Sequence, residues 1–378
     1  MYAPLRKNAI TISGKPLSGK STINNALVQS LGYKTYSVGD KVKQLAAERG
    51  VTPEDFYKKN IIEIDGAATA LDPYLDSWQQ QIGEQEEKFV VDSRIGFHFI
   101  PQSFRVFLDC DIEAAAQRAH QARKHNPAYA TPKYESMEKA KKTIAERVGD
   151  ERQNYAGRYG IPDFHLPFHY DLVVDTTTKK PGEVADKILR EYERYEKVTG
   201  EIALICWGLK MVVANRFTYF SGPITGSKAL YKAMKEHDVK RKEDLPKAVY
   251  DLIRQQNVDR SRELEERVRL KEESPALLPG KLGSADIWSQ RDYVDLSKET
   301  IRLKATELIF EDGWQYSNGC VEELLLALQL KKPMYDQQEN PLGKEKAVRL
   351  LATAVDEIHQ LPAECPKLDF LLEQLKRV

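Results

Sequence analysis

The chain has 378 residues, of which 41% are hydrophobic and 9% aromatic, with 21 Gly and 18 Pro. This composition is typical of a globular protein and excludes a disordered or fibrous one, and the length predicts two domains rather than one or four. Lys plus Arg and Asp plus Glu both number 57. The chain therefore lacks the basic surplus expected of a protein that holds a nucleic-acid polymer through its phosphates.

The four cysteines and the apolar stretches bear on the compartment. The cysteines lie far apart along the chain, a spacing that indicates neither a zinc cluster nor a disulfide framework. The N-terminal residues lack the apolar run of a signal peptide, and the strongest apolar stretch, 202–214, is too short to cross a bilayer. We therefore expect a cytoplasmic protein with no membrane partner.

The first half alternates short β-rich runs with longer amphipathic stretches. The runs lie at 9–13, 89–93, 104–109 and 170–176. Such a βαβ rhythm predicts a parallel sheet and an α/β fold. A helix that begins at Pro181 and continues to about Tyr195 follows the last run. We predict a first domain over residues 1–198 and an apolar, helical connector over residues 199–215.

A phosphate-loop motif lies between the first run and the first helix. Residues 14–21, GKPLSGKS, have the Walker A spacing in the structural context that this motif requires. Glycines let the backbone curl so that N–H groups point at phosphate oxygens, while Lys20 reaches the terminal phosphates and Ser21 can ligate Mg²⁺. The motif predicts ATP and Mg²⁺ as cofactors. Its nucleotide-binding residues are Gly14, Ser18, Gly19, Lys20, Ser21 and Thr22.

From Ala9 to about Tyr195 the chain resembles the nucleoside monophosphate kinases, and within them cytidylate kinase. Besides the phosphate loop, the resemblance rests on SVGD at 37–40, VVDSR at 90–94 and ERVGDER at 146–152. It implies a P-loop kinase domain that transfers a phosphoryl group from ATP to a (d)NMP. The implied acceptor is CMP, dCMP or a modified pyrimidine nucleotide.

The resemblance also implies roles for charged residues around the loop. Asp92 would help Ser21 to hold Mg²⁺, and Arg94 would meet the acceptor phosphate. The residues implied to act in catalysis are Lys20, Arg147 and Arg152, which would neutralise phosphate charge, and Asp92, which would act through Mg²⁺; Arg118 and Arg158 are weaker candidates. On the acceptor side the implied residues are Asp40, Asp65, Arg94 and Lys43, the last of these in a place where the family usually has Arg.

A second βα rhythm begins at 217–226. It continues with a helix at about 291–305, strands at 306–310 and 332–336, and a helix from about Gly319 to Lys331. We predict a second, smaller doubly wound (Rossmann or flavodoxin-like) α/β domain over 216–378. The segment at about 235–280 is rich in charges of both signs, a pattern typical of a solvated helical hairpin or insertion rather than a binding arm.

The loop FSGPITG at 220–226 and the segment 311–333 resemble the nucleoside 2-deoxyribosyltransferase and nucleotide N-glycosidase superfamily. There a Gly opens a helix and a nucleophilic Glu follows four residues later, which here are Gly319 and Glu323. The resemblance implies cleavage or exchange of an N-glycosidic bond through a glycosyl ester on that Glu. A second carboxylate is implied at Asp295, with Asp292 and Glu307 as alternatives. The implied substrate-binding residues are Ser221, Gly222, Thr225, Gly226, Ser317, Asn318 and Gly319.

Together these features predict a bifunctional nucleotide enzyme whose partners are small nucleotides. A homo-oligomer formed through the second domain is compatible with this interpretation. The alternative from another class is a nucleotide-sensing or scaffolding protein with an active kinase half and a non-catalytic, ligand-binding second half. Fold alone does not separate the two.

Overall fold

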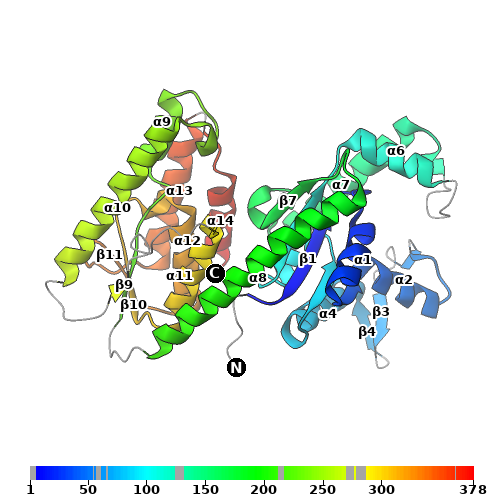
Figure 1. Ribbon diagram of the computed structural model, residues 1–378, viewed down its shortest axis with the longest axis horizontal. Helices are drawn as coiled ribbons and strands as arrows, with labels where there is room; N and C mark the ends of the chain where they lie inside the picture. Colours follow the sequence, from blue (N-terminus) through cyan, green and yellow to red (C-terminus); the bar gives the residue numbers. More distant parts are fainter. Residues whose placement is uncertain are drawn as a thin grey trace. The chain divides into compact units, whose positions relative to one another are not determined.

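The computed structural model describes residues 6–53, 55–56, 61–64, 67–123, 132–211, 217–269, 276–277, 287–361 and 363–378. The chain divides into two compact units, Met1–Thr199 and Gly200–Val378, each an α/β structure as the sequence predicts (Figure 1). Within the described ranges, no helix combines the length and the apolar character needed to span a membrane.

A five-stranded parallel sheet forms the centre of the first unit. Its strand order is β2-β5-β1-β6-β7. The strands are β1 (Ala9–Gly14), β2 (Lys34–Ser37), β5 (Phe89–Asp92), β6 (Phe104–Asp109) and β7 (Leu172–Asp175). The hydrophobic runs at 9–13, 89–93, 104–109 and 170–176 each contain a strand, so the predicted sheet is confirmed. The antiparallel hairpin β3 (Ile61–Ile64) and β4 (Ala67–Ala70) is an addition that the sequence analysis did not predict.

Helices connect these strands. They are α1 (Lys20–Leu31), α2 (Val38–Glu48), α4 (Leu71–Gln85), α5 (Gly96–Phe99), α6 (Ile112–Ala122), α7 (Met137–Tyr159) and α8 (Pro181–Met211), with the 3₁₀ turns η2 (Pro132–Tyr134) and η3 (Pro167–His169). Every residue of β1 is buried, and its Ile10 and Ile12 pack with Ile23 and Leu27 of α1. This packing fixes the loop between β1 and α1, because both of its ends belong to one apolar core.

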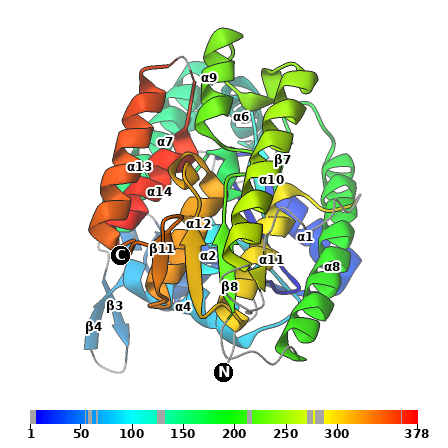
Figure 2. The same ribbon diagram turned by 90° about the vertical axis from the view of Figure 1, so that its left-hand side faces the viewer.

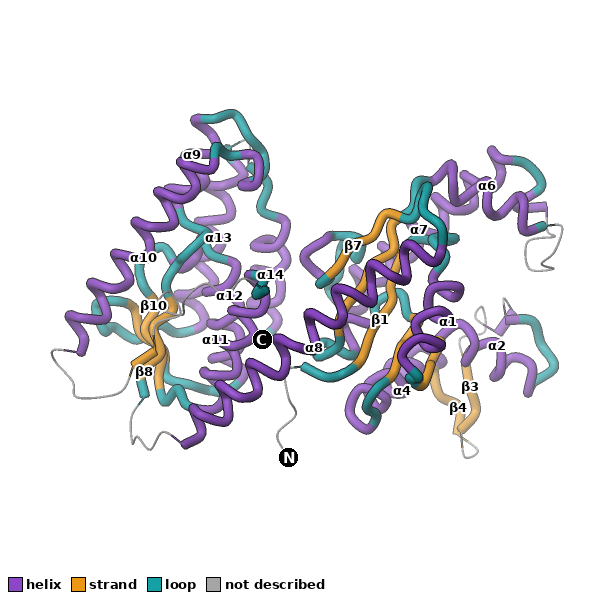
Figure 3. Tube along the Cα trace, viewed as in Figure 1, coloured by secondary structure: helices purple, strands orange, loops and turns teal. Residues whose placement is uncertain are grey.

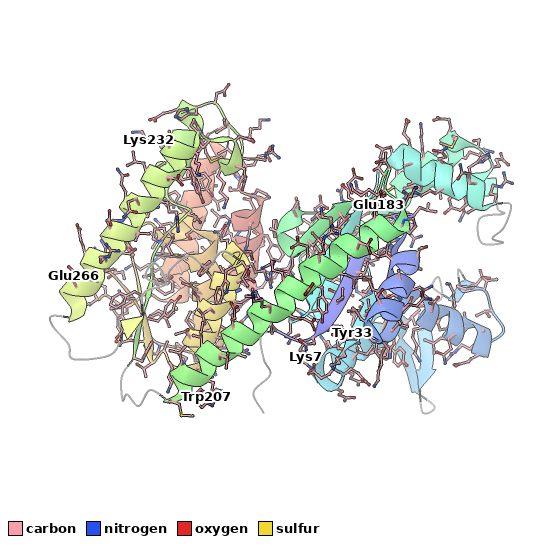
Figure 4. All side chains as sticks on the ribbon, in the orientation of Figure 1. Lys7, Tyr33, Glu183, Trp207, Lys232 and Glu266 are labelled. Carbon is pink, nitrogen blue, oxygen red and sulfur yellow. The ribbon has the colours of Figure 1, made fainter. Side chains whose placement is uncertain are left out.

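Helix α8 corrects the predicted boundary between a terminal helix and a separate connector. The helix predicted to end near Tyr195 continues without interruption to Met211, and Figure 4 shows Glu183 and Trp207 near its opposite ends. The connector over 199–215 therefore forms the last turns of the same helix as far as Met211. Residues 212–216 lie outside the described part of the chain.

The second unit is built on a smaller parallel sheet of order β11-β10-β8-β9, with helices on both sides of it (Figures 2 and 3). The strands are β8 (Thr218–Ser221), β9 (Ala276–Leu277), β10 (Glu307–Phe310) and β11 (Met334–Asp336). The helices are α9 (Lys228–Glu236), α10 (Lys247–Arg269), α11 (Gln290–Leu303), α12 (Asn318–Gln329), α13 (Lys344–His359) and α14 (Pro366–Arg377), with the turns η4 (Lys242–Asp244) and η6 (Trp314–Tyr316).

Alternation along β8 gives the two faces of this sheet different neighbours. Tyr219 packs in the main core of the unit with residues of α12, α13 and α14. The next residue, Phe220, points to the other face, where it meets Leu264 of α10. Because side chains along a strand alternate in direction, Ser221 returns to the face of Tyr219.

Helix α10 corrects the interpretation of the charged segment at 235–280. Four of its described residues, Ile253, Asn257, Ser261 and Leu264, are buried, and Leu264 packs against the sheet. The helix therefore covers one sheet face instead of standing in solvent. Its charged residues are largely exposed on the outer side, which is why the composition alone indicated a solvated hairpin.

Candidate active sites

The phosphate loop has the backbone geometry that its glycines predict. Gly14 has a φ of 155°, and a Cβ there would lie 2.5 Å from the carbonyl oxygen of Leu108. Gly19, with a φ of 93°, caps the start of α1. Only glycine adopts such angles without strain, so the loop needs both glycines to turn from the central strand into the helix. The amides at the start of α1 thereby become available to an anion.

A pocket of about 500 Å³ opens beside the start of α1. The loop contributes Lys20 and Ser21, and β5 contributes Asp92. Ser21 Oγ donates a hydrogen bond to Asp92 Oδ2 at 3.1 Å, so a hydroxyl and a carboxylate oxygen lie together, as hard divalent cations require. Burial and the positive charge of Arg94 lower the pKa of Lys20 to about 7. A phosphate anion placed in the pocket would relieve that repulsion.

Two arginines on different elements meet at one carboxylate in this pocket. Arg94 Nε and Arg147 Nε each donate to Glu151 Oε1 at 3.0 Å, and Arg94 also donates to the Gly14 carbonyl. Glu151 was not among the sequence-predicted site residues. Its position four residues after Arg147 on α7 is compatible with this ion pair, but the partnership with the distant Arg94 has no sequence signal.

The part of the pocket predicted to take the acceptor is lined by residues of α2, α4 and α7. Asp40 and Lys43 both line it, and they pair with each other at 2.7 Å with both side chains mostly exposed. From α4 come Asp72 and Asp76, which the sequence analysis missed; Tyr159 donates a hydrogen bond to Asp76 at 2.8 Å. The third predicted acceptor residue, Asp65, lies outside the described residues.

The remaining predicted arginines are distributed differently from the expectation. Arg152 is directed away from the pocket, where it donates to Asp163 at 2.9 Å and lies 3.1 Å from His165 Nδ1. Arg158, the weaker candidate, does line the pocket and pairs with Asp72. Arg118 donates to the carbonyl of Leu17 in the phosphate loop at 3.0 Å, so it supports the loop from behind.

Comparison with known proteins places this site in a family. A model of the AAA domain matches residues 10–143. The cytidylate kinase of Natronomonas pharaonis is 33% identical over 177 residues, which cover 46% of this chain and 84% of the kinase. The chain belongs to the cytidylate kinase family. The relationship rests on about half of the chain, and its first unit is a nucleoside monophosphate kinase-like P-loop domain, a fold that binds nucleoside triphosphates.

Two further similarities concern the same share of the chain. An S-adenosylmethionine-dependent nucleotide dehydratase from Lacinutrix mariniflava is 31% identical over 194 residues, which are 51% of this chain and 37% of that protein. The chain thus spans little more than a third of that relative. Among solved structures, shikimate kinase from Bacteroides thetaiotaomicron covers 50% of this chain and 98% of its own, at 12% identity and a TM-score of 0.36.

In the second unit, Glu323 on α12 is buried at the carboxyl end of β8. Its two carboxylate oxygens accept hydrogen bonds from Tyr219 Oη at 2.8 Å and from Ser221 Oγ at 2.6 Å. Burial raises the pKa of Glu323 to about 7, even though these hydrogen bonds act in the opposite direction. A carboxyl group that is partly neutral near pH 7 suits acid, base or nucleophilic chemistry better than an ordinary surface glutamate does.

The adjacent Glu322 has a different environment. Lys298 of α11 and Lys367 of α14 both form ion pairs with its carboxylate. Burial alone would raise the pKa of Glu322, but the two lysine charges outweigh it and hold that pKa well below its usual range. Neighbouring helix positions point about 100° apart. Glu322 therefore ties three helices together while Glu323 faces the sheet edge, the assignment that the sequence analysis favoured.

The loop after β8 packs against a second buried carboxylate, Glu311, at the end of β10. Glu311 accepts hydrogen bonds from Arg260 Nε at 2.7 Å and from Ser261 Oγ, both on α10. A Cβ on Gly222 would overlap the carboxylate of Glu311, so Gly222 is required by this close approach. Burial raises the pKa of Glu311 despite these partners. The sequence analysis missed Glu311, because its strand-end position was the only local signal.

The loop after β8 and the N-terminus of α12 meet at the predicted small residues. A Cβ on Gly226 would lie 2.8 Å from the carbonyl oxygen of Tyr316 and 3.1 Å from Ser317 Cα, so these two segments touch. Ser317 is the cap residue of α12, yet its side chain makes no capping hydrogen bond. Within the described ranges, the buried Oδ1 of Asn318 has no hydrogen-bond partner. Asn318 therefore keeps a polar atom for another group.

Two other predicted residues of this half, Thr225 and Gly319, and the nearby Trp314 have structural neighbours. Thr225 accepts a hydrogen bond from Gln290 at 2.7 Å. Gly319 belongs to the first turn of α12, where a Cβ would only touch Val294. Trp314 packs in the core against Phe310.

The three carboxylates predicted as possible partners of Glu323 each have a partner within their own helix or sheet. Asp295 is buried and pairs with Arg291 on its own helix at 3.5 Å, and Asp292 caps the start of α11 through Ser289. Glu307 opens β10, at the end of the strand opposite to Glu311, and accepts a hydrogen bond from Thr218 at 2.7 Å. Among these strand and helix positions, Glu311 is the carboxylate at the same sheet edge as Glu323.

Proposed function

We propose that the first unit is an ATP-dependent (d)NMP kinase that accepts CMP, dCMP or a related pyrimidine nucleotide. The observation that carries the proposal is the convergence of three groups in one pocket: Lys20 of the phosphate loop, the Ser21 and Asp92 pair, and the two arginines joined by Glu151. Phosphoryl transfer needs positioning and charge neutralisation rather than a covalent residue. The pocket offers both.

The residues of the loop fit a triphosphate and its metal. Ser18 Oγ is buried with no hydrogen-bond partner among the described residues, and a phosphate oxygen would supply one. Lys20 and the amides at the start of α1 would hold the phosphates of ATP, and Ser21 with Asp92 would hold Mg²⁺. When bound, ATP with Mg²⁺ supplies the phosphoryl group.

The charged residues around the loop divide the remaining work. Arg94 and Arg147 are held at the pocket by Glu151, and they would orient and neutralise the acceptor phosphate once it competes for their N–H groups. Asp40 and Lys43 stand at the mouth on the acceptor side. Since Lys lacks the planar fork of Arg, we expect Lys43 to bind the acceptor with a single charge contact rather than a bidentate one.

Substitution of Lys20 tests the kinase proposal. Lys20→Ala should lower ATP-dependent diphosphate formation by roughly two orders of magnitude or more, because its charge acts on the transferring phosphate. Lys34→Ala is the matched control, since Lys34 is exposed on β2 and pairs with Glu86 at 2.6 Å outside the pocket. A loss of less than about tenfold for Lys20→Ala would mean that the loop only binds nucleotide.

For the second unit we propose cleavage or exchange of a nucleotide N-glycosidic bond, with Glu323 as the nucleophile. Its burial beside Ser221 and Tyr219 favours this function over a purely structural role. The ionised carboxylate would attack the anomeric carbon as the bond to the base breaks, and water or another base would then release the sugar from the ester. Glu311, at the same edge, is the candidate for proton transfer to the departing base.

A trapping experiment separates this function from a ligand-binding role. Incubation with a 2-deoxy-2-fluororibosyl nucleotide, followed by peptide mass spectrometry, should give a glycosyl adduct on Glu323. An adduct on Glu322 would move the assignment by one residue. Binding of the nucleotide with neither an adduct nor base release would support the alternative, a sensing or scaffolding protein whose second half is not catalytic.

A further inference from the structure

Three potential metal ligands meet at the corner between α13 and α14. His359 is the last residue of α13, Cys365 caps the start of α14, and Asp369 follows within its first turn. His359 Nε2 lies 3.0 Å from Asp369 Oδ1, and Cys365 Sγ lies 3.9 Å from Asp369 Oδ2. All three ligand atoms are within 4.8 Å of one another. Cys365 and Asp369 are four residues apart, so they share one face of α14.

The three ligand atoms and the distances between them suit a borderline-soft metal ion such as Zn²⁺. An imidazole nitrogen, a thiolate and a carboxylate oxygen are the ligands that Zn²⁺ takes at about 2.0–2.3 Å in tetrahedral sites, which places neighbouring ligand atoms roughly 3.3–3.8 Å apart. The two separations that involve Asp369, 3.0 and 3.9 Å, bracket this range and all three atoms lie within 4.8 Å, so small changes of rotamer would complete the geometry. Mg²⁺ and Ca²⁺ instead prefer oxygen ligands throughout. The charges of a thiolate and a carboxylate would balance a divalent cation.

We propose that His359, Cys365 and Asp369 bind a divalent transition-metal ion of the zinc class, with the fourth coordination position open to water. On binding, the ion would displace the thiol proton of Cys365 to the solvent. The widely spaced cysteines gave no sign of such a site, because two of its three ligands are not cysteine.

A metal ion at this site would also stabilise the neighbouring helix α12. Lys367 lies between the two α14 ligands in sequence and points to the other side of the helix, where it pairs with Glu322 of α12. An ion that fixes the first turn of α14 to the end of α13 would therefore also fix the lysine that anchors Glu322. Through this contact the ion would stabilise the helix that carries Glu323.

Cobalt titration tests the site with a readout that does not depend on activity. The full-length protein is treated with a chelator, kept reduced and titrated with Co²⁺, which occupies zinc sites and reports its ligands optically. We expect one equivalent to give a thiolate-to-cobalt charge-transfer band in the near ultraviolet together with tetrahedral d–d bands. Co²⁺ at Ser21 and Asp92 would have oxygen ligands and would give no thiolate band.

Three variants decide whether the band belongs to this site. Cys365→Ser should abolish it, whereas Cys206→Ser, which removes a buried thiol of α8 in the same unit, should leave it unchanged. His359→Ala, at a half-exposed side chain, should fold normally and weaken Co²⁺ binding by more than about tenfold, the minimum expected even for a residue that only supports a metal ligand. Absence of the band in the wild type, or its survival in Cys365→Ser, would overturn the proposal.

Discussion

Substitution of two neighbouring glutamates on α12 should separate stability from chemistry in the second unit. Glu322→Gln leaves Lys298 and Lys367 facing a neutral amide, and loss of one partner from a buried ion pair costs about 3–5 kcal/mol. We expect a loss of about 3 kcal/mol, the lower end of that range, because both lysines keep part of their surface in water. For a unit of this size the melting temperature should fall by roughly 6–12 °C.

Glu323→Gln should behave in the opposite way. The amide keeps the volume and can still accept a hydrogen bond from Ser221 or Tyr219, and it removes the cost of burying a charge. Its melting temperature should therefore equal or exceed that of the wild type, while base release stops because an amide cannot capture the anomeric carbon. Calorimetry gives the first quantity and chromatography of released base the second.

Two outcomes would contradict these roles of the two glutamates. If Glu323→Gln lowered the melting temperature as much as Glu322→Gln, the buried charge of Glu323 would be stabilising, contrary to its raised pKa. If Glu322→Gln, assayed well below its melting temperature, lost base release while Glu323→Gln retained it, the functional residue would be the other one.

Three further predictions concern single groups. Burial raises the pKa of Glu323 from 4.5 to about 7, so between these pH values the folded protein retains a proton that the unfolded chain has released. From about pH 5 to about pH 8 the wild type should therefore lose up to roughly 3 kcal/mol of stability relative to Glu323→Gln. An unchanged difference in melting temperature between the two proteins over this pH range would contradict this. Gly222→Ala forces a Cβ onto the carboxylate of Glu311 and should cost about 1–3 kcal/mol in urea unfolding, whereas Gly182→Ala, where a Cβ meets nothing, should not destabilise. Arg94→Lys removes the planar fork and should lower kcat/KM for the acceptor at least about tenfold at unchanged fold, with no change in kcat/KM arguing against an acceptor contact.

The phosphate loop could be predicted because all of its determinants are local. The spacing of Gly14, Gly19 and Lys20 fixes a backbone shape, and the apolar runs on either side fix its place between a strand and a helix. Glu323 could be preferred over Glu322 through the resemblance of 311–333 to the deoxyribosyltransferase superfamily, in which the nucleophilic Glu follows four residues after the Gly that opens the helix. The structure supports that preference because only Glu323 faces β8.

The residues that sequence reasoning missed have partners far away along the chain. Glu151 binds Arg147 on its own helix and also Arg94, which lies 57 positions before Glu151 in the sequence. Glu311 binds Arg260, which lies 51 positions before it. Neither contact leaves a periodic or spacing signal. The same reason explains Arg152: its spacing in the motif suited a lid arginine, but the carboxylate of Asp163 holds it away from the pocket.

The predictions for two helical segments were wrong where tertiary packing overrides the composition of the segment. The charged segment 235–280 reads as solvated because most of its side chains are polar, and a few buried residues such as Asn257 and Leu264 are enough to dock α10 on the sheet. The long α8 has no proline between its charged and apolar parts, so the change in composition near residue 198 did not mark the end of a helix.

The most direct test of the kinase assignment is the product formed from a panel of nucleoside monophosphates. The wild-type protein is incubated with CMP, dCMP, UMP and AMP, each with and without ATP and Mg²⁺, and the nucleotides are separated by anion-exchange chromatography. Our account predicts that CMP or dCMP gives its diphosphate faster than AMP does, and only when ATP is present. Failure of every monophosphate to yield a diphosphate would contradict the account, whereas equal turnover of CMP and AMP would remove the pyrimidine preference.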